Sequence, residues 1–531
     1  MRPPDRRHPG PTRPWSSRRL ARPWILAACL LANSGCRASD QVPLHWPVAA
    51  PPPLRAESPV LWVALAARLG PGVNGSGAGG ATAAGAPLRL RAASGALTLR
   101  DASGQSLTAP AITLDWRWEA LPEPFTVRRR VLGPFASHES AEAAARPWLA
   151  SGQRPVIAKP GDWEVWAAPE APVPPGPAAR LVERRETRRL VLESRGRQGT
   201  KLWRGPLSLA APGGLRWGAG VHPGPFRLLP DAHGGWSLVE QVPLERYLEG
   251  VVPHEIGAGS PPAALAAQGV LARTWAVRNR ERFRADGYHL CADTQCQVYS
   301  DPSQASPAVR QAITASRGQV LVAGEQPIHA VYHASNGGVA AGLEEAWDVE
   351  AVPYLRPFPD GDPAFVANLP LPVTGTRLEA LVRHGQGAHG MDHPLFRWQR
   401  SLTAGGVEAA LAARGLSVGA PRSLKVLERG PSGRVVALEI TGSEGTVVLR
   451  RDAIRRTLRQ LPSTLFLLSQ PQSGRWLVEG GGFGHGVGLS QAGAIDLARQ
   501  GWSTETILQH YYPGAGLRPL LVLEQPVREG G

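Results

Sequence analysis

One glutamate, Glu255, is the residue of this chain best placed for acid–base chemistry. It precedes Ser260 and Pro261, which predict the N-cap and the first position of a helix over 261–284. Glu255 therefore stands just before the positive end of a helix dipole. Arg273 falls on a helix face of mostly small side chains that could line a cleft, so the two residues are predicted to share one wall of a site.

A glycine-rich run near the C-terminus surrounds a histidine. The run 480–488 has no Lys or Ser/Thr where a phosphate-binding loop needs them. Its glycines would let the backbone pass close to a ligand and present the imidazole of His485. We interpret His485, with Gln491 beside it, as a wall of a substrate site; the alternative is a tight packing turn.

A second polar group consists of His333, Ser335 and Asn336. A serine nucleophile with a nearby histidine would suggest a hydrolase, but Ser335 has no G-x-S-x-G elbow around it. We interpret the three residues as lining of the same cleft, with plain packing as the alternative.

These residues lie in five ordered blocks between about residues 235 and 520. The blocks are Leu244–Val252 followed by Glu255, Ala264–Ala276, Cys291–Tyr299, Tyr332–Gly338, and Gly482–Ala494 followed by Ile507–Gly514. The pattern resembles the stage II sporulation protein D (SpoIID) family, and the resemblance is weak before residue 200.

The resemblance implies a peptidoglycan lytic transglycosylase that cleaves MurNAc–GlcNAc bonds of glycan strands lacking stem peptides. Ordinary glycosidases use two carboxyl groups. A lytic transglycosylase uses one, which protonates the leaving oxygen and then draws the proton from the sugar's own 6-hydroxyl, leaving a 1,6-anhydro-MurNAc end. Glu255 matches the family's catalytic position. Arg273 would balance charge or hold the lactyl carboxylate of muramic acid, and the expected substrate-binding residues are His333, Ser335, Asn336, His485 and Gln491.

The same resemblance includes the LytB amidase enhancers, which leaves a second function open. In that interpretation the protein cleaves nothing and activates an N-acetylmuramoyl-L-alanine amidase. A wall-binding scaffold is a third interpretation. The presence of Glu255 and Arg273 favours the enzyme.

Two cysteines, Cys291 and Cys296, lie close together in the third block. In an oxidising compartment such a pair often forms a disulfide, and with a histidine it can hold zinc. Some relatives that the resemblance suggests have a histidine just before the second cysteine, where this chain has Gln295. His289 could take its place. A disulfide, a structural zinc ion and free thiols all stay open, and the chemistry itself requires no cofactor.

The helices and strands expected along the chain indicate an α+β fold. A β-rich N-terminal region is expected over 58–178. Within it, 131–168 resembles a sporulation-related repeat (SPOR) module, with a helix from Glu139 that Pro147 should end. A SpoIID-like catalytic domain is expected over 179–525, with the long helix 261–284 and further helices near 490–500 and 504–512.

The N-terminus predicts export. Residues 1–36 combine a basic start, an apolar core too short to span a membrane and a small-residue end, which is typical of a signal peptide. Arg18 and Arg19 suggest a twin-arginine signal, and Cys36 a lipoprotein cleavage site. A Pro-rich tether follows over 37–57. We expect a periplasmic or cell-envelope protein, bound to a membrane only through a lipid on Cys36.

The net charge of +15 comes almost wholly from arginine. Residues 1–35 carry seven Arg and one Asp, so +6 of it is lost with the signal peptide. No dense basic cluster with interleaved aromatic residues occurs in the body of the chain, which argues against nucleic acid as a partner. The expected partners are peptidoglycan glycan strands and, in the second interpretation, an amidase.

Overall fold

The computed structural model describes residues 46, 48–55, 57–72, 76–77, 85–174, 178–196, 199–472 and 474–521. The chain from Val42 onward forms one compact unit. The predicted signal peptide, Cys36 and most of the predicted tether lie outside the described residues. Within the described ranges, no helix is both long enough and apolar enough to cross a membrane.

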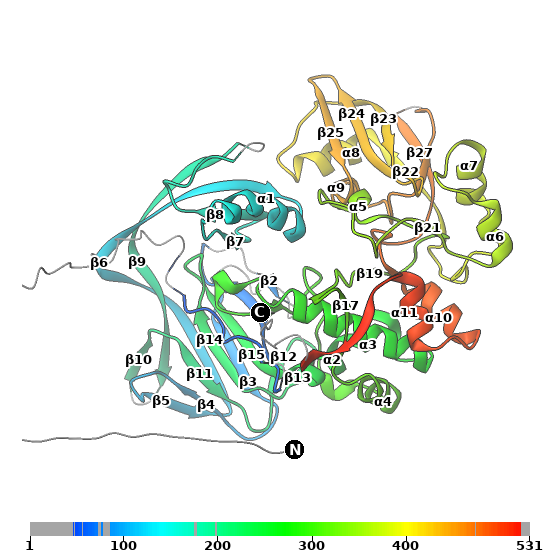
Figure 1. Ribbon diagram of the computed structural model, residues 1–531. Coiled ribbons are helices and arrows are strands. Elements are labelled where there is room, and N and C mark those ends of the chain that lie inside the picture. The colour runs from blue at the N-terminus through cyan, green and yellow to red at the C-terminus, as the bar shows by residue number, and fades with distance from the viewer. Residues whose placement is uncertain are drawn as a thin grey trace, which may run out of the picture. The chain divides into compact units, whose positions relative to one another are not determined.

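The fold is mixed α+β and rich in strands, which confirms the predicted class (Figure 1). The α-helices are α1 (His138–Ala150), α2 (Leu244–Val252), α3 (Pro262–Arg278), α4 (Pro307–Ala315), α5 (Leu343–Ala346), α6 (Pro363–Asn368), α7 (Gly375–Arg383), α8 (Ala404–Ala412), α9 (Asp452–Thr457), α10 (Gln491–Arg499) and α11 (Thr504–Tyr511). The last two confirm the helices expected near 490–500 and 504–512.

Two large sheets occupy the N-terminal half. The first sheet consists of β16 (Leu290–Cys291), β1 (Val60–Leu69), β15 (Trp236–Pro243), β14 (Phe226–Pro230), β11 (Leu207–Ala210), β4 (Leu97–Arg100) and β5 (Ser106–Ala109), with β2 (Ser76–Gly77) beside β1. The second consists of β10 (Gly199–Trp203), β9 (Arg180–Gly196), β6 (Ala111–Phe135), β3 (Leu88–Ala92), β12 (Leu215–Trp217) and β13 (Gly220–His222), with β8 (Trp163–Ala167) and β7 (Val156–Ala158) attached to β6.

Strand β1 ties the N-terminal region to the segment that carries Glu255. It pairs antiparallel with β15 and parallel with β16. Since β15 runs directly into α2, and α2 into the turn that holds Glu255, the first sheet sets the position of that turn. β16 likewise anchors the start of the segment 291–299, which we call the cysteine loop.

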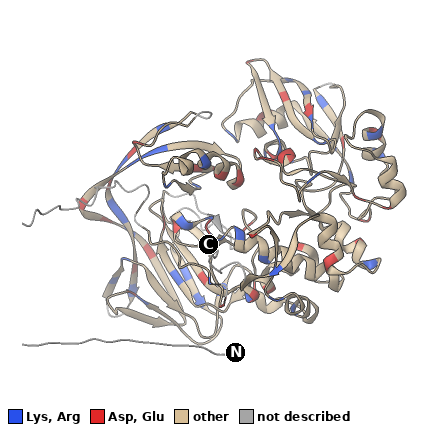
Figure 2. Cartoon of the chain, viewed as in Figure 1, with Lys and Arg blue, Asp and Glu red and all other residues tan. Residues whose placement is uncertain are grey.

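The long strands β6 and β9 pair antiparallel and carry many charged residues (Figure 2). Helix α1 and strands β7 and β8 follow β6, which gives the strand–helix–strand–strand order predicted for 131–168. The prediction that Pro147 ends the helix is wrong, because α1 continues to Ala150. Trp148 explains this: it is buried and its indole N–H donates to the Pro172 carbonyl at 2.6 Å, which holds the last turn in place.

Helix α3 differs from its prediction at both ends. It stops at Arg278 rather than at 284, because the Asn279 side chain donates to the Trp275 carbonyl and caps it. At the start, Pro261 occupies the N-cap position. Ser260 is not the cap; its hydroxyl donates back to the Ile256 carbonyl at 2.7 Å.

The C-terminal half contains smaller sheets. One consists of β22 (Arg397–Thr403), β27 (Arg475–Gly481) and β26 (Phe466–Leu468), and another of β23 (Pro421–Arg429), β24 (Val435–Gly442) and β25 (Thr446–Arg450). These two sheets share a separate apolar core. The remaining strands are β17 (Gln319–Ala323), β18 (Gln326–Pro327) and β29 (Gly516–Pro519), β19 (Tyr332–His333) with β28 (Leu489–Ser490), and β20 (Val339–Ala340) with β21 (Phe358–Pro359).

Candidate active site

Glu255 lies in a five-residue π-helical turn, Pro253–Gly257, between α2 and α3. Its carboxylate oxygen Oε1 accepts a hydrogen bond from the backbone N–H of Val298 at 3.1 Å. The Tyr332 hydroxyl also hydrogen-bonds to this carboxyl group. The carboxyl group is thus held from two sides by residues 43 and 77 positions further along the chain.

Glu255 lines a pocket of about 280 Å³. The walls come from stretches that are far apart in the sequence, among them α1, α3 with the turn after it, residues 294–298, residues 331–332 and α9. Three aromatic side chains, Trp275, Tyr332 and Trp347, also line it. A hollow with aromatic and polar walls beside the Glu255 carboxyl group can hold a sugar next to an acid.

The other two carboxylates in this pocket form ion pairs with arginines. Glu139 accepts from Arg282 at 3.0 Å, and that ion pair helps to lower the pKa of Glu139 to about 2 despite its burial. Asp452 accepts two hydrogen bonds from Arg455, at 2.9 and 3.1 Å. Among the described residues, Glu255 is the pocket carboxyl group without an arginine, lysine or histidine partner.

The pKa of Glu255 is raised above its ordinary value. Burial is the main cause, because removing water penalises the charged form. The hydrogen bonds from Val298 and Tyr332 favour the carboxylate and offset part of this rise. Glu255 therefore keeps its proton to higher pH than an exposed glutamate does, which a general acid requires.

A chain of hydrogen bonds fixes the direction of the Tyr332 hydroxyl. The Tyr247 hydroxyl donates to Gln297 Oε1 at 3.2 Å, and Gln297 Nε2 donates to the Tyr332 oxygen at 3.0 Å. Because the Tyr332 oxygen already accepts from Gln297, its own hydrogen is available for the carboxyl group of Glu255.

His485 lines the same pocket, but both of its ring nitrogens hydrogen-bond to backbone groups. The Val487 N–H donates to Nδ1 at 3.1 Å, so the proton sits on Nε2, which donates to the Tyr332 carbonyl at 3.0 Å. Burial lowers the pKa of His485 to about 4, which keeps it neutral. His485 therefore positions Tyr332, and the buried ring of His333 packs edge-on against it.

Arg273 does not line the Glu255 pocket. It is fully buried, and its guanidinium donates to both carboxylate oxygens of Glu245, at 2.8 and 2.7 Å. A third bond at 3.1 Å goes to the Gln319 carbonyl. The prediction that Glu255 and Arg273 share one wall of a site is therefore wrong. Arg273 instead links α3 to α2 and β17.

Ser335, Asn336 and Gln491 likewise lie in packing contacts outside this pocket. Ser335 exchanges backbone hydrogen bonds with Phe483. The Asn336 amide donates to Asp360 at 2.6 Å, and Gln491 donates to Gln268 on α3 at 3.3 Å. Of the predicted substrate-binding residues, the structure brings only His485 to the wall of the Glu255 pocket.

Comparison with known proteins agrees with the sequence blocks. Residues 232–322 match a family model described as Stage II sporulation protein. The Stage II sporulation protein D of Bacillus amyloliquefaciens is 29% identical over 298 residues, covering 52% of this chain and 75% of the relative. Its counterpart in Bacillus subtilis (strain 168) is 27% identical over 292 residues, covering 52% and 74%. This similarity places residues 232–322 of the chain in the SpoIID family.

Two further comparisons found similarity to a second family model and to another protein. Residues 341–488 match a model described as Domain of unknown function (DUF8618). A protein of Bacillus subtilis (strain 168) named Amidase enhancer is 26% identical over 298 residues, covering 51% of this chain and 40% of that protein. The SpoIID match contains Glu255 and the cysteine loop, whereas α9 and His485 belong to the second segment.

Cys291 and Cys296 form a disulfide bond in the structure. The predicted third ligand, His289, is engaged elsewhere: Nδ1 accepts from the Trp62 N–H at 2.9 Å, and Nε2 lies 2.9 Å from the Pro52 carbonyl. With the sulfurs bonded to each other and both imidazole nitrogens bonded to backbone, these residues do not fit a zinc site. The described part of the chain contains no other group of three metal-ligating side chains.

The disulfide closes the six-residue loop 291–296 and ends two residues before Val298, the donor to Glu255, which leads to a testable prediction. Reduction should lower the melting temperature of the protein, because a six-residue loop is worth about 2 kcal/mol of chain entropy. A chelator should have no effect, and the Cys291→Ser/Cys296→Ser variant should not respond to reductant. A chelator-sensitive melting temperature together with metal found by elemental analysis would instead establish zinc.

Sequence reasoning missed several pocket residues. Tyr332 stands one position before the predicted His333, and Val298 lies in the block 291–299, so the blocks themselves contained a signal. Arg455 and Asp452 lie outside the five blocks. No pattern in the chain marked them, because α9 reaches the pocket only through tertiary packing.

Proposed function

We propose that this protein is a peptidoglycan lytic transglycosylase that cleaves MurNAc–GlcNAc bonds in glycan strands lacking stem peptides. One observation carries the proposal: Glu255 has a raised pKa and no cationic partner, whereas the other carboxyl groups in the pocket, Glu139 and Asp452, are paired with arginines. A pocket with one available carboxyl group suits a reaction in which the same group acts as acid and then as base.

In the proposed reaction, protonated Glu255 donates its proton to the glycosidic oxygen while the bond from that oxygen to the anomeric carbon of MurNAc breaks. The Glu255 carboxylate then accepts the proton of the 6-hydroxyl of the same sugar, whose oxygen bonds to the anomeric carbon. Glu255 regains its proton and no water is consumed. Val298 and Tyr332 stabilise the carboxylate form between the two steps. The reaction needs no metal or organic cofactor.

The test is mass spectrometry of glycan strands incubated with the purified protein. We expect 1,6-anhydro-MurNAc ends to accumulate on sacculi whose stem peptides an amidase has removed, and much more slowly on intact sacculi. Reducing ends instead of anhydro ends would indicate a hydrolase and reject the proposed mechanism. No new ends of either kind would reject the enzyme.

A second candidate function is non-enzymatic enhancement of an N-acetylmuramoyl-L-alanine amidase. The similarity to a protein named Amidase enhancer favours it. It predicts that the wild type and the Glu255→Gln variant stimulate an amidase equally while neither cleaves glycan.

Both functions require the protein outside the cytoplasm, and we propose that it acts in the periplasm or cell envelope on peptidoglycan glycan. The proposal rests on the predicted signal peptide and on the relatives' names. Attachment to a membrane through a lipid on Cys36 belongs to the same proposal.

The raised pKa of Glu255 predicts the pH dependence of cleavage. Because Glu255 must be protonated to start the reaction, kcat should be high below its raised pKa and fall as pH rises through it. The Tyr332→Phe variant loses a bond that favours the carboxylate, so the falling limb should move to higher pH. A profile that stays the same in this variant would show that Tyr332 does not act on the catalytic carboxyl group.

A further inference from the structure

A larger hollow opens beside the Glu255 pocket. Its volume is about 890 Å³, and it shares Thr294, Gln295, Arg455 and Arg456 with that pocket. One side comes from the segment around α1 and β8, and the other from residues of the segment that matches the domain of unknown function. The two hollows are therefore contiguous around one pair of arginines.

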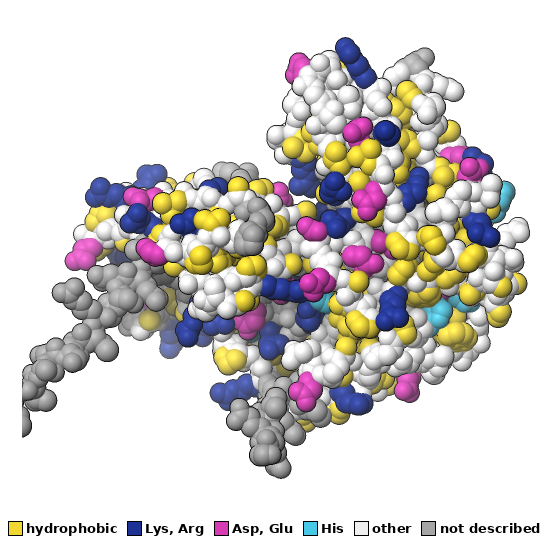
Figure 3. All heavy atoms as spheres, turned by 45° about the horizontal axis from the view of Figure 1, so that its top comes forward, with side chains coloured by type: hydrophobic (Ala, Val, Ile, Leu, Met, Phe, Trp, Pro, Cys, Tyr) yellow, Lys and Arg dark blue, Asp and Glu magenta, His cyan; other side chains and the backbone are white. Residues whose placement is uncertain are grey.

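The lining of this hollow is strongly basic, and we call it the arginine groove. It contains six cationic side chains and one carboxylate, Asp162. The cations are Lys159, Arg400, Arg414, Arg455, Arg456 and Arg459. In the space-filling view, Lys and Arg side chains lie near the centre of the face shown, with Asp and Glu side chains among them (Figure 3).

Most of this charge is not neutralised by the protein. Asp162 forms an ion pair with Arg414 at 3.8 Å, and Asp452 forms ion pairs with Arg455 and Arg456. Within the described part of the chain, Arg400 and Arg459 have no carboxylate partner; Arg400 donates only to the adjacent Gln399 carbonyl. Unpaired guanidinium groups in a hollow are suited to bind carboxylates or phosphates.

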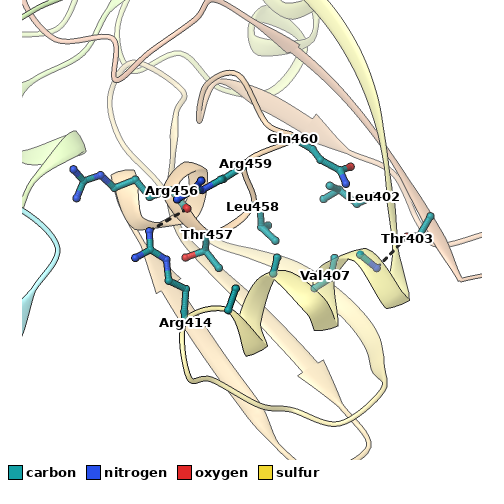
Figure 4. Close-up of a pocket in the computed structure, with 12 residues that line it drawn as sticks. Leu402, Thr403, Val407, Arg414, Arg456, Thr457, Leu458, Arg459 and Gln460 are labelled. Carbon is teal, nitrogen blue, oxygen red and sulfur yellow. Dashed lines mark hydrogen bonds between the residues drawn. The ribbon is translucent and has the colours of Figure 1, made fainter. Parts of the chain in front are cut away.

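A third hollow, of about 400 Å³, adjoins the groove, and Figure 4 shows the residues that line it. It shares Arg414, Arg456 and Arg459 with the groove. Leu402, Val407 and Leu458 line its interior, and helix α8 forms one wall. A guanidinium rim over apolar side chains suits a group that carries both a charge and a methyl.

We propose that the arginine groove binds a carboxylated glycan strand and guides it to Glu255, so that the segment of unknown function is a substrate-binding part of the protein. This inference rests on the proposed function. A strand without stem peptides has one free lactyl group per disaccharide, with a carboxylate and a methyl. Arg400 and Arg459 bind the carboxylates of sugars beyond the cleaved bond, and the hollow behind Arg459 accepts the methyl.

The groove is therefore a set of outer subsites, and its effect depends on strand length. Long strands reach from Glu255 into the groove, whereas an oligosaccharide of one or two disaccharides contacts little beyond the Glu255 pocket. The bound charges are partly exposed, so affinity should weaken with salt, which screens charge within about 8–10 Å at physiological ionic strength.

The test compares Arg400→Glu/Arg459→Glu with Arg422→Glu, an exposed arginine of β23 that does not line the groove. Binding is measured in the full protein carrying Glu255→Gln, so that no strand is cut. The probes are long amidase-treated glycan strands and uncharged chitin oligosaccharides. We expect the double variant to bind the charged strands at least about 10-fold more weakly, with a flatter salt dependence, and Arg422→Glu to bind like the parent. Chitin binding should be unchanged in all three.

Cleavage gives a second readout with Glu255 intact. In the double variant, kcat/KM on long strands should fall while that on short oligosaccharides stays constant, which also shows that the variant is folded. Equal binding of long strands by the double and control variants would overturn the inference even if the protein cleaves glycan. Charge-dependent binding by a protein that never cleaves would keep the groove and reject the enzyme. Tighter binding of a polyglycerol-phosphate polymer than of glycan would assign the groove to phosphates and overturn the inference.

Discussion

Replacing Glu255 by Gln is expected to reduce the formation of 1,6-anhydro ends by about 100-fold or more, with the fold intact. Gln has nearly the same shape and can still accept the Val298 hydrogen bond, but it cannot transfer a proton, and acid–base catalysis alone contributes at least that factor. The measurement is the initial rate of anhydro-end formation on amidase-treated strands, with the melting temperature as a check on folding.

The matched control is Glu281→Gln, which changes an exposed glutamate beyond α3 that does not line the pocket. It should retain the parent rate. If Glu255→Gln cleaves as fast as this control, Glu255 is not the acid and the proposed mechanism fails.

The second large effect is expected at Arg273, and on stability rather than on chemistry. Arg273→Met should destabilise the protein by about 3–5 kcal/mol, because it leaves the largely buried carboxylate of Glu245 without its partner. The Gln319 carbonyl would also lose a donor. The measurement is the midpoint of denaturant unfolding, alongside kcat on glycan strands.

A double-variant cycle separates stability from catalysis. Adding Glu245→Gln to Arg273→Met removes the uncompensated charge, so part of the lost stability should return. Where the single variant remains folded, its kcat should stay within a few-fold of the parent. A normal unfolding midpoint combined with a collapse of kcat would mean that Arg273 acts on the substrate after all.

These two residues illustrate why a family block does not assign roles by itself. Glu255 and Arg273 stand in neighbouring blocks of the SpoIID pattern, yet only Glu255 lines the pocket. Arg273 sits on the face of α3 that packs against Glu245 of α2. Sequence spacing placed Arg273 on a face that could line a cleft, but α3 is buried on all sides from Ala264 to Val277, so Arg273 meets α2 rather than a cleft.

The bounds of a helix or strand could be predicted where they depend on residues within or next to that element. The α+β class, helices α10 and α11 and the strand order after α1 follow from periodicity and turn residues near each element. The end of α3 was not predictable in this way, because it depends on the Asn279 side chain capping the Trp275 carbonyl. Nor was the extension of α1 past Pro147, because it depends on Trp148 reaching Pro172.

The resemblance of five sequence blocks to the SpoIID family, the likeness of Glu255 to a catalytic acid and the options open to two nearby cysteines can all be read from the sequence. Each block, like the cysteine pair, consists of residues close together in the chain. Three contacts follow instead from the packing of distant segments: Tyr332 and Val298 bind the Glu255 carboxyl group, His485 donates to the Tyr332 carbonyl, and arginines of α9 line the pocket. The physical reason is that these contacts join segments tens to hundreds of residues apart, and which side chains meet there depends on how the sheets and helices pack.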